Sequence, residues 1–164
     1  MDSSIITGIS TLLAVGLTLF FTTRREKYKF IQDLKMREYN DLESFYTSLI
    51  ASLEKTIRYT ERGENYKELL DENSIISAKA NLISTEAINE QLRKVSDVLY
   101  EWSSYYRKSL PTKFGETGYG FTSNIDMKHK ATADKIYPTL HKEIGKLIEL
   151  IKLELTKQKK YLQT

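Results

Sequence analysis

Three stretches of the chain after residue 23 repeat apolar residues with the period of an α-helix. In the first, from about residue 24 to residue 62, the apolar positions return every three, four or seven to eight residues, which places them on one helix face. Nothing interrupts this pattern before Gly63, a typical residue for a helix C-terminus. The apolar face consists of Ile31, Leu34, Leu42, Phe45, Leu49, Leu53 and Ile57.

The other helical stretches are shorter. Residues 66–83 are expected to form one or two helices, interrupted near residues 71–74, and Ser84 or Thr85 is a suitable N-cap for a helix that ends near Ser109. A last helix is expected from about Pro138, because proline is tolerated in the first turn. The apolar face of the helix that ends near Ser109 consists of Ile88, Leu92, Val95, Leu99, Trp102 and Tyr106. The apolar face of the last helix consists of Leu140, Ile144, Leu147, Ile151 and Leu155.

The N-terminal region has a different pattern, because residues 5–22 include no charged side chain. As a helix, 18 residues rise about 27 Å, which is close to the thickness of the hydrocarbon core of a bilayer. A cleaved signal peptide competes with this interpretation, but it would have positive charge before the apolar run and a small-x-small cleavage site after it. We therefore expect an uncleaved transmembrane helix over residues 1–23, and residues 24–164 as an antiparallel helical bundle. The predicted fold class is all-α, with the span continuing into the first long helix of the bundle.

The charges next to the span predict its orientation. Asp2 is the only charged side chain before it, whereas six basic residues follow it closely. Lysine and arginine near a span stay in the cytoplasm, so the N-terminus should face outward and the bundle should be cytosolic, in a single-pass protein of the inner (plasma) membrane. The nearest basic residues are also placed to contact anionic lipid. These topology and lipid-facing residues are Arg24, Arg25, Lys27 and Lys29.

One side of the expected span is small and polar. Its residues recur at intervals of three or four: Ser4, Thr7, Thr11, Ala14, Thr18 and Thr22. In one interpretation the threonines bond to carbonyls of their own helix and face lipid. In another, this stripe is a self-association face, because small residues let helices approach closely and hydroxyls bond across them. In a third, several copies turn the stripe inward to line a pore.

Residues 110–128 form the one long segment without helical periodicity. The glycines in it do not match a phosphate-binding loop, because no strand precedes them and no Gly-Lys-Ser/Thr follows. Its aromatic residues are expected either to pin the segment to the bundle or to contact a partner protein. They are Phe114, Tyr119 and Phe121.

Composition and motifs argue against an enzyme. The chain has no cysteine and two histidines, and Asp126-x-x-His129 is the single carboxylate-x-x-His pair, whereas a di-iron bundle needs two. We expect no metal, no cofactor and no small-molecule substrate. The net charge of +3 is too low to indicate nucleic-acid binding.

The order of these parts resembles that of small bacterial single-span membrane proteins: one N-terminal span, Arg-Arg at its cytosolic edge, a long helix rich in tyrosine and glutamate, and a helical bundle. Residues 77–92 are similar to a segment of these proteins in which a helix breaks at a small or hydroxyl residue and restarts. Some of them resemble antiphage-defence effectors that assemble in the inner membrane and permeabilise it. The resemblance implies a homo-oligomeric membrane protein and, in its stronger form, a channel-forming effector; the alternative is a non-enzymatic anchor whose bundle binds a cytosolic partner protein.

Overall fold

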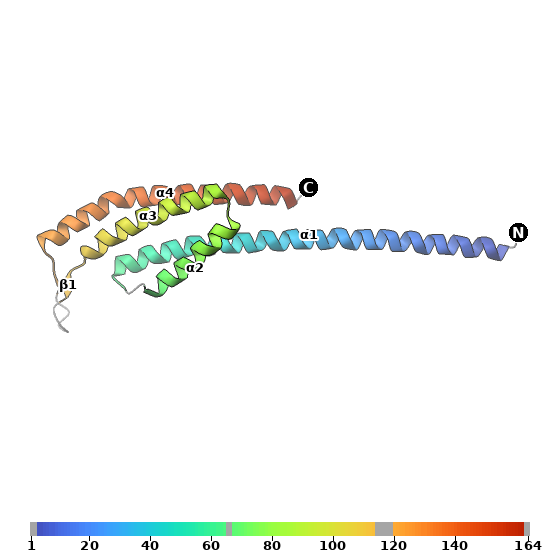
Figure 1. The fold of residues 1–164 in the computed structure, drawn as a ribbon, viewed down its shortest axis with the longest axis horizontal. Helices are drawn as coiled ribbons and strands as arrows, with labels where there is room; N and C mark the ends of the chain where they lie inside the picture. The colour runs from blue at the N-terminus through green and yellow to red at the C-terminus, as the bar shows by residue number, and fades with distance from the viewer. Residues whose placement is uncertain (1–2, 65–66, 114–119, 163–164) are drawn as a thin grey trace. The chain divides into compact units, whose positions relative to one another are not determined.

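The computed structural model describes residues 3–64, 67–113 and 120–162, and these ranges are almost entirely helical (Figure 1). For residues 3–14, 17, 67–68, 70–71 and 112–113 the description is limited to the backbone. The expected all-α fold is confirmed. In chain order the helices are α1 (Ser3–Arg62), α2 (Lys67–Ile83), α3 (Glu86–Lys108) and α4 (Asn124–Leu162).

Helix α1 runs without a break for 60 residues and ends where the sequence predicts. Gly63 has a φ of +66°, the left-handed conformation that glycine adopts without a steric penalty. Its N–H donates to the Thr60 carbonyl, and the Glu64 N–H donates to the Tyr59 carbonyl, both at 3.1 Å. These paired bonds form a Schellman motif, which satisfies carbonyl groups at the helix C-terminus.

The chain divides into two compact units. Residues 42–157 make up the larger one, which contains the hydrophobic core of the bundle. Residues 1–41 and 158–164 make up the smaller one, in which Lys35 Nζ lies 4.2 Å from the centre of the Tyr161 ring.

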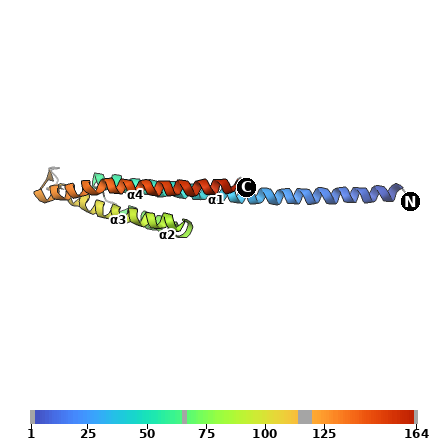
Figure 2. The same ribbon diagram turned by 90° about the horizontal axis from the view of Figure 1, so that it is seen from above.

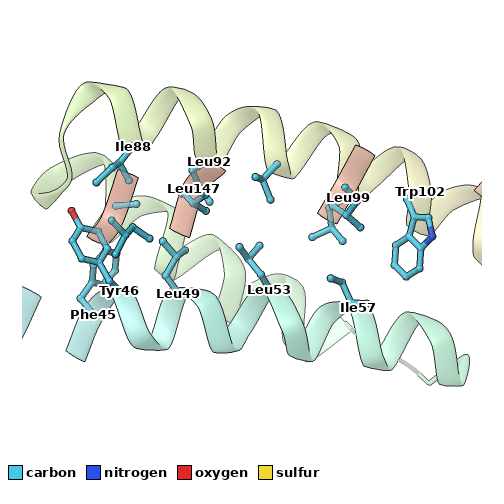
Figure 3. Packing of buried hydrophobic residues seen from close by; sticks show 14 of the residues in the cluster. Phe45, Tyr46, Leu49, Leu53, Ile57, Ile88, Leu92, Leu99, Trp102 and Leu147 are labelled. Carbon is cyan, nitrogen blue, oxygen red and sulfur yellow. The ribbon is translucent and has the colours of Figure 1, made fainter. Parts of the chain in front are cut away.

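The core of the larger unit lies between α1, α3 and α4 (Figure 3). It uses the faces that periodicity predicts, with Phe45 and Leu49 from α1, Leu92 from α3, and Leu147 from α4 all buried. At the edge of the core, Gln91 of α3 donates from Nε2 to the Glu143 carboxylate and main-chain carbonyl of α4, at 2.8 and 3.0 Å.

Not every predicted core position is buried. Ile31 and Leu34 of α1 are exposed, because they precede Leu42, the first residue of the larger unit. Tyr106 is half-buried, with its ring centre 5.2 Å from that of Trp102.

Helix α2 packs beside α1 and α3, and it lies with α3 on one side of the α1–α4 pair of the larger unit (Figure 2). The expected interruption near residues 71–74 is wrong. Asn73 sits within the helix, where its side-chain amide donates to Thr56 Oγ1 of α1 at 3.0 Å and its Oδ1 accepts from Ser52 Oγ. These bonds to α1 occupy the side chain, so it does not compete for the backbone of its own helix.

Helix α4 begins 14 residues before the expected start at Pro138, so the segment without helical structure is shorter than residues 110–128. Ser123 and Asp126 form a capping box at the observed start of α4. Pro138 lies inside the helix, where it cannot donate to the carbonyl four residues earlier, and Figure 1 shows α4 bending in its N-terminal half.

Two short strands, β1 (Thr112–Lys113) and β2 (Gly120–Phe121), pair antiparallel in the connection between α3 and α4. At the start of α3, Thr85 occupies the N-cap position, as expected, but its side chain makes no capping hydrogen bond.

Among the residues whose side chains are described, no helix has a stretch long and apolar enough to cross a membrane. Residues 5–14 and Leu17 of the expected span lie outside that description.

Candidate functional site

The small, polar stripe of the N-terminal helix is described at its last two positions. Thr18 and Thr22 are both exposed, and the Thr22 hydroxyl donates to the Thr18 carbonyl at 2.8 Å. This is the bond expected if the threonine hydroxyls donate to main-chain carbonyls of their own helix. The side chains of Ser4, Thr7, Thr11 and Ala14 lie outside the described residues.

The apolar residues next to these threonines cover the other sides of the helix. Leu19, Phe20 and Phe21 are 62%, 60% and 64% exposed. Consecutive residues of an α-helix are about 100° apart, so these three side chains cover most of its circumference. Helix α1 therefore exposes large apolar groups around most of its circumference at this level, and the exposed Thr18 and Thr22 occupy the remaining side.

The expected lipid-facing basic residues lie just beyond this apolar ring. Arg24, Arg25, Lys27 and Lys29 are all exposed, and no acidic group among the described residues forms an ion pair with them. Their positive charges are therefore available to groups outside the chain.

The aromatic residues of the 110–128 segment are described at one position. Phe121 in β2 is 63% exposed, so it does not pin the segment to the bundle. Phe114 and Tyr119 lie outside the described residues.

Both histidines lie in helix α4, although His129 comes before the expected helix start at Pro138. The ring centres of His129 and Tyr105 are 6.0 Å apart, and those of His141 and Tyr137 are 4.4 Å apart. Within the described ranges, no three histidine, aspartate or glutamate side chains come together as a possible metal site.

The larger unit contains a cleft of about 410 Å³, bounded by α1, α2 and α3. A cavity of this size is within the usual range for small-molecule sites. Its floor is mostly apolar and buried, whereas its rim is mostly polar and exposed. The floor residues are Leu49, Leu53, Thr56, Leu92, Leu99 and Ser103.

The two hydroxyls of the floor are already used within the protein. Thr56 Oγ1 donates to the Ser52 carbonyl at 2.9 Å and accepts from the Asn73 amide. Ser103 Oγ donates to the Tyr100 carbonyl at 3.0 Å. A molecule in the cleft therefore meets a floor that behaves as an apolar surface.

The rim of the cleft carries one charged group. Asp97 is on α3, three residues before Tyr100, whose side chain is 76% exposed. Residues three apart are neighbours on a helix surface, so the carboxylate and the aromatic ring stand at the same part of the rim. Ser96 and Ser77 add hydroxyls to it from α3 and α2.

The sequence pattern does not indicate this cleft, because its lining residues come from three helices and most of them read as core positions. One signal is visible in retrospect: Ser52, Thr56 and Thr60 recur every four residues on α1, and all three are buried. Buried hydroxyls at helical spacing predict a polar contact with a neighbouring helix.

Comparison of the chain with protein-family models, with known proteins and with solved structures finds no match.

Proposed function

We propose that the chain is a single-span membrane protein that self-associates through its N-terminal helix, with residues 24–164 on the cytosolic side. The observation that carries the proposal is the ring of exposed apolar side chains at Leu19, Phe20 and Phe21. A helix that exposes large apolar side chains around most of its circumference needs an apolar environment, and a bilayer supplies one. The charge-free residues 5–22 extend this surface to about the length of a span.

Self-association is supported by the part of α1 that follows. Tyr28, Phe30, Ile31 and Leu34 are exposed, although the sequence there is otherwise rich in charge. Large apolar side chains grouped on an exposed surface mark sites of interaction. A second copy of the same helix would cover them; the small, polar stripe of the adjoining span lies on another face of α1 and would form a separate contact between copies inside the membrane.

The absence of cysteine makes this proposal testable with single introduced thiols. In membranes from expressing cells, alkaline carbonate should leave the full chain in the pellet. Ser3→Cys should react with an impermeant maleimide from outside, whereas Lys79→Cys should react only after lysis. Release by carbonate, or the opposite labelling, would contradict the span or its orientation.

The self-association face has a matched control on the same helix. Oxidation should cross-link Thr11→Cys and Thr18→Cys into dimers, while Ile9→Cys and Phe20→Cys, which lie on the opposite side of the helix from the stripe, should stay monomeric. Equal cross-linking at all four positions would mean that the stripe is not the contact.

We propose, in the stronger form, that the assembled spans form a channel and that the protein acts as a membrane-disrupting effector in antiphage defence. The threonine stripe supports the channel, and the architectural resemblance supports the defence role. Replacing Thr11 and Thr18 together by leucine should abolish ion leak on expression, whereas Leu12→Ala should leave it. Unchanged conductance of the double variant would contradict the proposal that the spans form a channel.

A second candidate is an anchor whose bundle binds a cytosolic partner. The outer face of α2 favours it, because Leu82 and Ile75 are exposed there, two turns apart. In this case an unrelated span of equal length should preserve activity, and Leu82→Glu should abolish it. The channel predicts the reverse result for both changes.

A further inference from the structure

We propose that the cleft between α1, α2 and α3 binds a small amphipathic molecule with a hydrocarbon body and an ammonium head. The residues that carry this inference all lie within the larger unit. The inference does not depend on the span or on self-association.

The floor specifies the body of the ligand. Leu49, Leu53 and Leu92 contribute apolar surface, and the hydroxyls of Thr56 and Ser103 already have partners inside the protein. A polar group placed on this floor would lose its bonds to water without gaining new ones, which costs free energy. Hydrocarbon gains by burial there.

The rim specifies the head. Asp97 is the one charged residue among those that line the cleft, and within the described ranges no lysine or arginine forms an ion pair with it. Tyr100, three residues later on the same helix, adds an exposed aromatic ring to the same part of the rim. A carboxylate and an aromatic face together favour a cation, by charge and by the cation–π interaction.

Asp97 and Tyr100 also disfavour a ligand with an anionic or a neutral head group. An anionic head would be repelled by Asp97 and would find no basic residue in the lining. A neutral hydroxyl could bond to Ser77 or Ser96, but it would gain neither the charge interaction nor the interaction with the ring. The expected order of affinity is therefore cation, neutral molecule, anion.

Three compounds that share one hydrocarbon body test this order: phenylbutylamine, phenylbutanol and phenylbutyrate. Each is titrated calorimetrically into the full chain, kept monodisperse in buffer or in phosphatidylcholine nanodiscs, with the matching blank subtracted. We expect the amine to bind about fivefold more tightly than the alcohol, which is the upper end of what an exposed charge interaction contributes, and the carboxylate to bind most weakly. Equal affinity for the three compounds would overturn the proposal.

Two pairs of variants locate the binding. Asp97→Asn should reduce the preference for the amine over the alcohol, while Glu101→Gln, an exposed carboxyl of α3 outside the cleft, should not. Ser77→Phe should block the cleft and abolish binding of all three, while Ala78→Phe, on the exposed side of α2, should leave it. Circular dichroism verifies that each variant is folded. Amine binding that survives Ser77→Phe in a folded variant would place the site elsewhere and refute the inference.

Discussion

Ser123 and Asp126 exchange two hydrogen bonds at the start of α4. The Ser123 N–H donates to Asp126 Oδ2 at 2.6 Å, and the Asp126 N–H donates to Ser123 Oγ at 3.1 Å. Each side chain occupies a backbone donor that the first turn of a helix otherwise leaves unpaired. The pair explains why α4 begins well before Pro138. It also makes this helix start sensitive to single substitutions and to pH.

Replacing the cap should destabilise the protein measurably. We expect Ser123→Ala to lower the free energy of unfolding by about 1 kcal/mol, the usual cost of losing a serine N-cap. Urea titrations followed by circular dichroism measure this value. Thr156→Ala is the control, because that hydroxyl is on the same helix, is exposed, and bonds only within its own turn. A loss at Thr156 as large as that at Ser123 would argue against a capping role.

The capping box should also produce an acid-dependent contribution to stability. Hydrogen bonds from Ser123 hold the pKa of Asp126 below the usual 3.8. A carboxyl whose pKa is lower in the folded state stabilises the fold fully above its unfolded pKa, and this stabilisation is lost as the pH falls through the folded pKa. Asp126→Asn should therefore be less stable than the wild type at neutral pH, and the deficit should shrink below about pH 4.

Urea midpoints measured across this range test the effect, with Glu149→Gln as a control at an exposed carboxyl of the same helix. A deficit that stays constant down to low pH would show that the charge of Asp126 is not involved.

The contact between Gln91 and Glu143 predicts a second pH effect, of electrostatic origin. Hydrogen bonds from Lys146 and from Gln91 lower the pKa of the Glu143 carboxyl. Gln91→Glu would replace a donor by a second carboxylate at a buried position, and like charges that close repel. The variant should melt several degrees below the wild type at neutral pH and recover most of the difference in acid, where one carboxyl is protonated. Asn81→Asp, which adds a carboxylate at an exposed position, should show little change at either pH; equal shifts in the two variants would contradict the specific contact.

Local patterns were sufficient to predict the helices and most of the core. Phe45, Leu92 and Leu147 occupy the buried faces that periodicity indicates, because an amphipathic helix has one way to bury its apolar stripe. The end of α1 at Gly63 was also predictable, since the signal lies within a few residues. The start of α4 was predictable in principle from the Ser-x-x-Asp spacing, but Pro138 gave a stronger and misleading signal.

Contacts between helices were not predictable in the same way. Asn73 looked like part of an interruption, yet it is held in α2 by Ser52 and Thr56, which come earlier in the chain on another helix. The cleft likewise depends on how α1, α2 and α3 are placed relative to one another, and periodicity carries no information about that placement. Asp97 and Tyr100 therefore read as ordinary exposed residues until the three helices are placed together.

Two glycines should respond to alanine with opposite signs. Gly63 has a φ of +66°, and an added Cβ would stand 2.9 Å from Leu110 Cδ1, so Gly63→Ala combines backbone strain with a steric clash and should cost about 1 kcal/mol or more. Gly145 is an exposed residue inside α4, with nothing within 4 Å of an added Cβ, and Gly145→Ala should stabilise the protein by about 0.5–1 kcal/mol, because alanine restricts the unfolded chain. Urea denaturation of the two variants beside the wild type measures both changes. Since the substitution is chemically the same, an equal shift in the same direction would contradict the assignment of Gly63 to the left-handed C-terminus of α1.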